Sequence, residues 1–352
     1  MKDDRTIILI ADYCGTPKEN GEVPGHFAKV LREYRSLLND EFTVDIATAF
    51  NAEGVLCRNR YILEISPGGK VLNRYQEIVL KVRRISRILS FKGYDIIWFL
   101  NTDYLLFLIL MIHPDTLKKV IFIQYEDGFK GKKIVACIKN TVYHYVMKRA
   151  KLVICTNRNL KTFGARICYM PDYYYDANIY EKYRNIKKDK VAVCLGTMHK
   201  EKDLEGLIEV FNKLNIELEI CGYFSNEDWF NTLKSRAKNN ITMQNRYIGY
   251  EEYLEKMASA KYVILPYNMN SYYNRPSGVL VESVFVRTIP VAPNELLRSN
   301  EIDGIGYKRI QDLTRESFDV DWGIYHKKYD HLISFRFSKE FVKKQLIDAL
   351  KN

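Results

Sequence analysis

The sequence predicts an α/β protein made of two doubly wound parallel-sheet domains. Apolar runs of four to seven residues alternate with longer segments of helical periodicity along the whole chain, a pattern typical of βαβ units. The chain has 352 residues, more than one ordinary core holds. Its 47% hydrophobic and 28% charged residues are typical of a folded chain. Two sheets with helices on both faces are therefore expected.

The first half is predicted to contain five strands and four helices. Each strand is a short apolar run, and each helix is a longer segment with apolar residues three or four positions apart. The expected strands are 6–11, 43–47, 95–100, 119–124 and 152–156. The expected helices are 26–38, 71–89, 102–112 and 133–149.

The alternation stops between Pro171 and Lys190, where tyrosines and charged residues replace aliphatic ones, and then begins again. We therefore expect a first domain at 1–172, a linker at 173–189, a second domain at 190–335 and a terminal helix at 336–352. Two doubly wound domains imply a cleft at the carboxyl ends of their strands. The expected strands of the second domain are 191–195, 217–221, 241–244, 262–266 and 288–292, with helices at 204–214, 227–237, 250–258 and from 277 onwards.

The cysteine content and the charge distribution indicate in which compartment the protein acts and what kind of partner it has. Seven cysteines occur singly, without metal-ligand spacing, and the N-terminus lacks a signal-peptide core, so a cytoplasmic protein is expected. Of the net charge of +11, residues 1–175 carry +9, from 27 Lys and Arg against 18 Asp and Glu. Among Leu, Ile and Val at helical spacing, this excess suits an anionic membrane surface or an anionic substrate. A solvated helix face is an equal alternative.

An apolar strand runs up to Gly196 and is followed by a polar loop and a helix that Asp203 can cap. A glycine and a helix N-terminus after a strand are typical of an anion site, because free backbone N–H groups and the helix dipole favour a phosphate. Lys200 and Lys202 would add positive charge. An ordinary surface loop is the alternative.

A second site of the same kind lies in Asn274–Pro290, NRPSGVLVESVFVRTIP. The Ser277-Gly278 turn opens a short apolar helix, its glycine would let a ligand approach the backbone, and Arg275 could donate to a phosphate or sugar. Glu282 stands alone among apolar residues and needs a polar partner. A ligand hydroxyl would provide one, and a basic neighbour on the helix surface is the alternative.

In the first half, a long glycine-punctuated loop leads to Gly25 and to a helix that opens at His26, as expected for substrate admission. Glu126 and Asp127 follow a strand, where an acid of the cleft would lie, although helix capping is the alternative. The Asp319-x-Asp321 pair falls in an irregular stretch, and the histidines have no metal-ligand spacing. A metal-independent mechanism without a cofactor is therefore preferred.

The segments LGTMHKEKDLEGLIEVF, ASAKYVILPYN and NRPSGVLVESVFVRTIPVAP resemble the nucleotide-binding domain of GT-B glycosyltransferases, in particular the retaining family 4 type (glycosyl transferases group 1). The resemblance implies two Rossmann-like domains that face a central cleft, with a C-terminal helix that crosses back to the N-terminal domain. It covers residues 190–295 well, and the first half only by layout.

The resemblance also assigns roles to residues. Gly196 matches the family's glycine, Lys202 its lysine and Glu282 its second glutamate, which contacts ribose. The amides of Ser277, Gly278 and Val279 would meet the diphosphate. Two positions depart from the pattern, since Thr197 stands in place of an arginine and Asn274 in place of the first glutamate. The candidate catalytic residues are Lys202, Asn274 and Asp127, the donor is bound by these matches together with Thr197 and Arg275, and Gly25, His26 and Glu126 lie on the acceptor side.

The implied activity is that of a hexosyltransferase-type glycosyltransferase, retaining and metal-independent. It would transfer a sugar from a nucleotide-diphosphate sugar, with UDP or GDP favoured, to a glycan or lipid-linked glycan in bacterial-type surface polysaccharide synthesis. Such an enzyme would be peripheral at the inner face of the cell membrane. Thr197 and Asn274 also allow a catalytically silent GT-B-like binding subunit. No recognised nucleic-acid-binding module is present, so nucleic acid is not expected as a partner.

Overall fold

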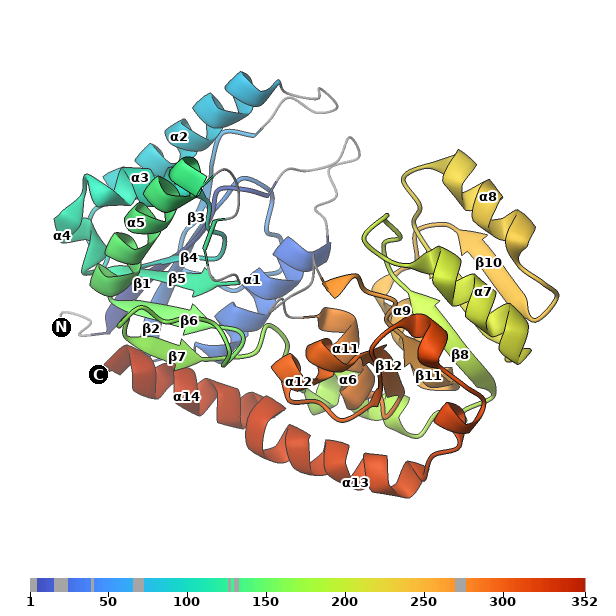
Figure 1. Cartoon of the computed structure of the whole chain (residues 1–352). Helices are drawn as coiled ribbons and strands as arrows, with labels where there is room; N and C mark the ends of the chain where they lie inside the picture. The colour runs from blue at the N-terminus through green and yellow to red at the C-terminus, as the bar shows by residue number, and fades with distance from the viewer. Residues whose placement is uncertain are drawn as a thin grey trace. The chain divides into compact units, whose positions relative to one another are not determined.

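The computed structural model describes residues 5–15, 25–38, 41–65, 73–125, 128–129, 133–269 and 277–351. The chain divides into two compact units: the first joins Met1–Asp172 with Val342–Asn352, and the second is Tyr173–Phe341. Each unit contains one parallel β-sheet with helices packed against it (Figure 1). The predicted α/β class with two doubly wound sheets is confirmed.

The first unit has a seven-stranded sheet in the order β3-β2-β1-β4-β5-β6-β7. β1 lies inside the sheet and pairs with β2 and β4, so that Ile8 faces both Val44 and Ile96. Ile8–Ala11 have no exposed surface, because a strand of a parallel sheet is covered on both faces. The strands are β1 (Thr6–Asp12), β2 (Phe42–Thr48), β3 (Arg60–Ile62), β4 (Ile96–Phe99), β5 (Val120–Gln124), β6 (Leu152–Cys155) and β7 (Ile167–Tyr169).

Helices of the first unit begin where polar side chains satisfy free backbone N–H groups. Asn73 and Gln76 form a capping box at the start of α2, and Asp103 caps α3. α3 packs between α2 and α5 on one face of the sheet (Figure 1). The helices are α1 (Gly25–Leu37), α2 (Arg74–Ser90), α3 (Tyr104–Met111), α4 (Pro114–Leu117), α5 (Lys133–Arg149) and the C-terminal α14 (Lys339–Lys351).

α14 belongs largely to the first unit, because residues from Val342 onwards are part of it. Val342, Leu346, Ile347 and Leu350 are buried along one face of this helix. Arg166 donates to the carbonyl of Ala349 over 2.7 Å. The C-terminal segment therefore returns to the N-terminal unit.

The second unit has a six-stranded parallel sheet in the order β10-β9-β8-β11-β12-β13. The order reverses beside β8, which pairs with β9 on one side and β11 on the other. Ligands of open parallel sheets bind at the carboxyl ends of strands next to such a reversal. The strands are β8 (Lys190–Leu195), β9 (Leu218–Gly222), β10 (Ile241–Asn245), β11 (Ala260–Ile264), β12 (Ile289–Pro293) and β13 (Ile305–Tyr307).

Asp203 caps α7 by accepting from the N–H of Gly206 over 2.9 Å, as predicted. Asp321, one of the two acids of the D-x-D pair, is likewise a helix cap, since it accepts from Gly323 and Ile324 at the start of α13. The helices are α6 (Ala177–Arg184), α7 (Leu204–Leu214), α8 (Glu227–Arg236), α9 (Tyr250–Ser259), α11 (Gly278–Phe285), α12 (Asn294–Asn300) and α13 (Trp322–Leu332), which continues into the π-helical turn Ile333–Phe337.

Residues 173–189, expected to be a linker, lie in the second unit and contain α6. Asp176 caps this helix by accepting from Asn178, and Tyr180 and Tyr183 are buried in the core of the second unit. The apolar face of α6 is made of tyrosines instead of aliphatic residues. Because this face lacks aliphatic residues, the sequence shows no apolar periodicity that would predict a helix here.

Of the helices that the structure describes, α3 is the most apolar, and it has only eight residues. Among the residues that the structure describes, no helix combines the length and apolarity needed to cross a bilayer.

Candidate functional site

The loop after β8 passes very close to the end of β9. Gly196 adopts a φ of +99°, a conformation that side chains disfavour. A Cβ atom built on Gly222 would lie 1.8 Å from the carbonyl oxygen of Gly196, whereas one built on Gly196 would meet nothing within 4 Å. Open space therefore adjoins the backbone of Gly196, while Gly222 is required for the contact between the loops.

We expect Gly222→Ala to lower the free energy of unfolding by about 1–3 kcal/mol, because the new methyl group would overlap a backbone atom that can move only with its loop. Urea denaturation of the variant would measure the loss. Gly249→Ala is a suitable control, since a Cβ at Gly249 meets nothing within 4 Å. Equal stability of the two variants would contradict the expectation.

Lys202 places an ammonium group inside the second unit. Its side chain is 6% exposed, and its Nζ contacts the carbonyl of Leu195 at 3.5 Å and the sulfur of Met198 at 3.9 Å. Within the described part of the chain no carboxylate lies within ion-pair distance of it. Burial lowers the pKa of Lys202, because the charged form loses its hydration. An anionic ligand would supply the missing partner.

Tyr267 connects Lys202 to the start of α11. Its ring centre lies 5.5 Å from Lys202 Nζ, and its backbone bridges that of Lys202. The Ser277 hydroxyl donates to Tyr267 Oη over 3.4 Å and accepts from the N–H of Leu280, which caps α11. Sequence reasoning missed Tyr267, although a polar aromatic residue directly after Pro266, the last residue of the expected strand, was a usable signal.

Gly278 begins α11 and has little free space on its Cβ side. A Cβ atom there would lie 2.8 Å from the ring of Tyr173, so the close neighbour of this glycine is a side chain of the same unit. Val279 follows it in the first turn of α11.

Glu282 is 4% exposed, as its apolar neighbours predicted, and two tyrosines are among its partners. Tyr250 donates to Oε1 over 2.6 Å and Tyr180 over 3.2 Å. Burial, reinforced by the charge of Glu282, raises the pKa of Tyr253 well above its usual value. The alternative of a carboxylate on the helix surface is not what the structure shows, because Glu282 is buried.

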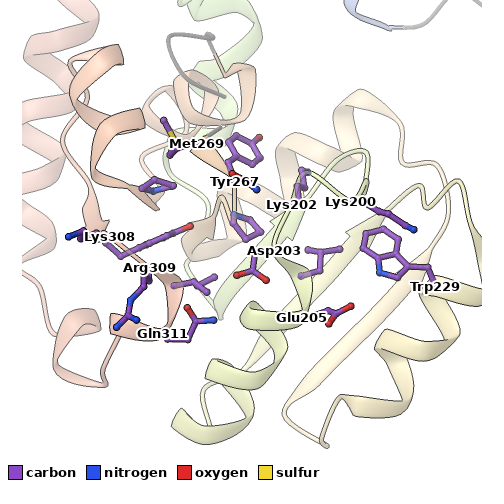
Figure 2. A pocket seen from close by; sticks show the side chains of 16 residues that line it. Lys200, Lys202, Asp203, Glu205, Trp229, Tyr267, Met269, Lys308, Arg309 and Gln311 are labelled. Atoms are coloured by element: carbon purple, nitrogen blue, oxygen red, sulfur yellow. The ribbon is translucent and has the colours of Figure 1, made fainter. Parts of the chain in front are cut away.

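A cavity of about 700 Å³ opens at the carboxyl ends of β8, β11, β12 and β13 (Figure 2). It is large enough for a nucleotide-sized ligand. Four cationic side chains and two carboxylates line it, but Asp203 caps α7 and Glu205 pairs with Arg236. The lining residues are Lys200, Lys202, Asp203, Leu204, Glu205, Trp229, Pro266–Met269, Pro293 and Tyr307–Gln311.

The structure brings only some predicted donor residues together. Lys202 lines the cavity, and Tyr267 connects Lys202 to Ser277. Glu282 instead accepts from Tyr250 and Tyr180 and is not among the lining residues. Thr197 is exposed beside Gly196. Burial lowers the pKa of His199, and the charge of Lys202 acts in the same direction.

Several predicted residues are not located. Asn274, Arg275, Glu126 and Asp127 lie outside the described residues. In the first unit, Gly25 and the following His26 are the first residues of α1.

No protein-family model matches the chain, and no curated protein matches its sequence. Solved structures match its fold over nearly the whole length. Anabaena HepE, solved with UDP and glucose, is 12% identical with a TM-score of 0.66, covering 99% of this chain and 100% of the other. The chain has the GT-B fold.

Two further structures show how widely this fold is used. An α,α-trehalose-phosphate synthase (UDP-forming) from Burkholderia vietnamiensis is 10% identical, with a TM-score of 0.69 and coverage of 99% and 98%. A protein from Listeria monocytogenes assigned as a UDP-N-acetylglucosamine 2-epimerase is 10% identical, with a TM-score of 0.58 and coverage of 99% and 96%. At these identities the likeness establishes the fold alone, so the function is argued from the site.

Proposed function

We propose that the protein is a glycosyltransferase that moves a sugar from a nucleotide-diphosphate sugar to a hydroxyl group of a glycan or lipid-linked glycan. The observation that carries the proposal is Lys202, a buried ammonium group that lines a nucleotide-sized cavity and has no carboxylate partner in the described chain. Keeping an uncompensated charge there costs stability, so a binding role explains it best.

The chemistry of the site suits a leaving diphosphate. When the sugar–phosphate bond breaks, negative charge develops on the diphosphate oxygen. Lys202 is a fixed donor that stabilises such charge without reorganisation, and the first N–H groups of α11, which have no acceptor within the helix, would add to it. The open space at Gly196 lets a phosphate approach the backbone.

The donor is proposed to be a UDP or GDP sugar. Solved neighbours bind or form UDP, according to their descriptions as a complex with UDP and glucose and as a UDP-forming synthase. We also propose retention of configuration and a role in surface polysaccharide synthesis, which the sequence resemblance implies, and independence from metal, which the lack of metal-ligand spacing in the sequence favours. The acceptor is assigned to the first unit, near Gly25 and His26, with Asp127 as its catalytic acid or base.

The proposal is tested by thermal-shift screening against UDP, GDP, CDP and dTDP, followed by calorimetry with the nucleotide that raises the melting temperature most. We expect micromolar binding of one diphosphate. Lys202→Ala should weaken it at least tenfold, and Lys213→Ala, an exposed change on α7, should not. Absence of binding by all four nucleotides would refute the proposal.

A catalytically silent binding subunit is the second candidate, favoured by one observation: the exposed residue beside Gly196 is Thr197, which carries no charge for the diphosphate. The two candidates differ in turnover. A transferase releases nucleoside diphosphate only when a glycan acceptor is added, whereas a silent subunit binds the nucleotide and releases nothing. Acceptor-independent conversion of the sugar itself would instead indicate an epimerase.

A further inference from the structure

One edge of the seven-stranded sheet exposes a large apolar side chain. β3 ends the strand order on its side and pairs with β2. Ile62, the last residue of β3, is 44% exposed, and Leu56 before the strand and Ile65 after it are 81% and 45% exposed. An exposed apolar strand at a sheet edge is a template for pairing with another chain.

The other three edge strands lack this feature. β7, at the opposite edge of the same sheet, lies beside α14, where the thiol of Cys168 contacts the carbonyl of Gln345 at 3.8 Å (Figure 1). β10 and β13 form the edges of the six-stranded sheet, and their exposed residues are Thr242 and Gly306. Among the edge strands that the structure describes, β3 alone exposes a large apolar residue.

The backbone of β3 directs alternate residues toward β2 and toward the open edge. The carbonyl of Asn59 and the N–H of Leu63 bond to β2 over 3.0 and 2.8 Å, so the odd-numbered residues face that strand. The even-numbered residues Arg60, Ile62 and Glu64 therefore direct their N–H and C=O groups to the edge. Within the described chain, no backbone carbonyl accepts from the N–H of Arg60 or Ile62.

This open edge is complementary to itself in one antiparallel register. In a two-fold symmetric pair, the residue that lies opposite itself fixes the partners of all the others. With Ile62 opposite the partner's Ile62, Arg60 lies opposite the partner's Glu64, and Glu64 opposite the partner's Arg60. All three positions have outward backbone groups and side chains on one face, as the hydrogen-bonded pairs of an antiparallel ladder require. An ion pair then lies on each side of an apolar pair.

The two charged side chains of this register are available for pairing. Arg60 and Glu64 are both exposed. Arg60 donates to the carbonyl of Val55 over 3.1 Å, and Glu64 lies 3.5 Å from Arg83 in an ion pair whose side chains are at least half exposed. Such an exposed pair contributes little, so Glu64 can change partner at small cost. The carbonyl of Glu64 accepts from Arg84 and has a second lone pair for the ladder.

We propose that the protein forms a two-fold symmetric dimer in which β3 pairs with β3 of a second copy, centred on Ile62, so that two sheets become one. Opposite charges directly across an antiparallel pair stabilise it. A second copy presents the required order of charges by symmetry, whereas an unrelated chain would not. Because few residues of each chain take part, we expect a dissociation constant of about 10–100 µM.

The test is charge reversal, followed by analytical ultracentrifugation at concentrations up to about 500 µM. Arg60→Glu places like charges opposite each other on both sides of the symmetry axis, and so does Glu64→Arg. Each variant alone should therefore dimerise at least tenfold more weakly than the wild type. An equimolar mixture of the two should form a heterodimer as strong as the wild-type dimer, because opposite charges face each other again. That recovery would also show that both variants are folded.

Ile62→Pro tests the backbone pairing. Proline removes an N–H group that faces away from β2, so the sheet should remain intact while dimerisation weakens at least tenfold. Ile324→Ser, at a 53% exposed isoleucine of α13 in the second unit, is the control and should dimerise like the wild type.

A cross-link tests the register directly. Residues of a hydrogen-bonded antiparallel pair have Cα atoms about 5.5 Å apart, which is within the range of a disulfide. Ile62→Cys, in a background of Cys57→Ser and Cys137→Ser, should therefore form a disulfide-linked dimer under mild oxidation, and Ile324→Cys should not. Burial raises the pKa of the Cys14 thiol to about 12, so Cys14 should react slowly.

Four outcomes would each overturn the proposal: a wild type that stays monomeric, charge-reversal variants that do not associate when mixed, a dimer that survives Ile62→Pro, or no cross-link through Ile62→Cys. The dimer involves the first unit and does not depend on the function proposed above. Nucleotide binding, measured on the same variants, should be unchanged. Loss of the dimer with intact nucleotide binding would therefore reject the pairing and leave the proposed function standing.

Discussion

Replacing Lys202 by methionine is expected to lower kcat/KM for sugar transfer by about 10²–10³-fold and, at the same time, to stabilise the protein. The ammonium group stabilises charge that develops on the leaving diphosphate, and loss of one such donor typically has this effect. The same group is buried with only a carbonyl oxygen and a sulfur as partners, so a methionine of similar length should raise the free energy of unfolding by about 1–3 kcal/mol.

The value of kcat/KM and the free energy of unfolding together distinguish a lysine that binds the diphosphate from one that only supports the fold. A lysine that merely held the loop together would lower stability when replaced, whereas a binding lysine lowers activity while stability rises. Lys213→Met on α7 controls for general effects of removing a positive charge. Because burial lowers the pKa of Lys202, diphosphate binding by the wild type should weaken as the pH rises through that pKa, and this dependence should be absent from the variant.

Asp172→Asn is expected to stabilise the first unit at alkaline pH. Burial raises the pKa of Asp172 to about 7, despite hydrogen bonding from Tyr125 and the charge of Lys29, and its Oδ1 is buried without a hydrogen-bond partner. Between pH 4 and pH 7 the folded state holds a proton that the unfolded state has released. Stability of the wild type therefore falls as the pH rises through this window.

Asparagine does not ionise, so Asp172→Asn should remove the loss of stability between pH 4 and pH 7. The difference in unfolding free energy between Asp172→Asn and the wild type should grow by about 2–3 kcal/mol from pH 5 to pH 8. Calorimetric melting of the first unit at several pH values would measure it. Asp176→Asn is an informative comparison in the second unit, because pairing with Lys339 lowers the pKa of that carboxyl and its replacement should destabilise the second unit at neutral pH. A constant difference across the range would contradict the assignment.

The two sheets were predictable because most of their strands are apolar on both faces, which leaves runs such as Ile7–Ile10 readable in the sequence. The edge strands β3, β7 and β13 were missed, since each has three residues and little apolar signal. α6 was missed for a chemical reason: its buried face consists of Tyr180 and Tyr183, and tyrosines in a charged segment resemble a linker.

The positions at which strands end and helices begin around the site could be predicted from the sequence. The side chains that contact one another there could not. Gly196, the cap at Asp203 and the start of α11 at Gly278 all follow from local rules. The partners of Glu282 come from helices 32 and 102 residues away in sequence, and no local pattern pairs them. The same holds for Tyr173, whose ring explains Gly278 across a long separation.

The return of the C-terminus to the first unit has a consequence for synthesis of the chain. The second unit, Tyr173–Phe341, is continuous, whereas the first lacks Val342–Asn352 until these residues have been synthesised. Most of the first unit leaves the ribosome before the second, but the first is completed after it, because Val342, Leu346 and Leu350 are synthesised later than Phe341. In a nascent chain the second unit should therefore become resistant to protease before the first. A stop codon after Phe341 should leave the second unit folded and the first incomplete.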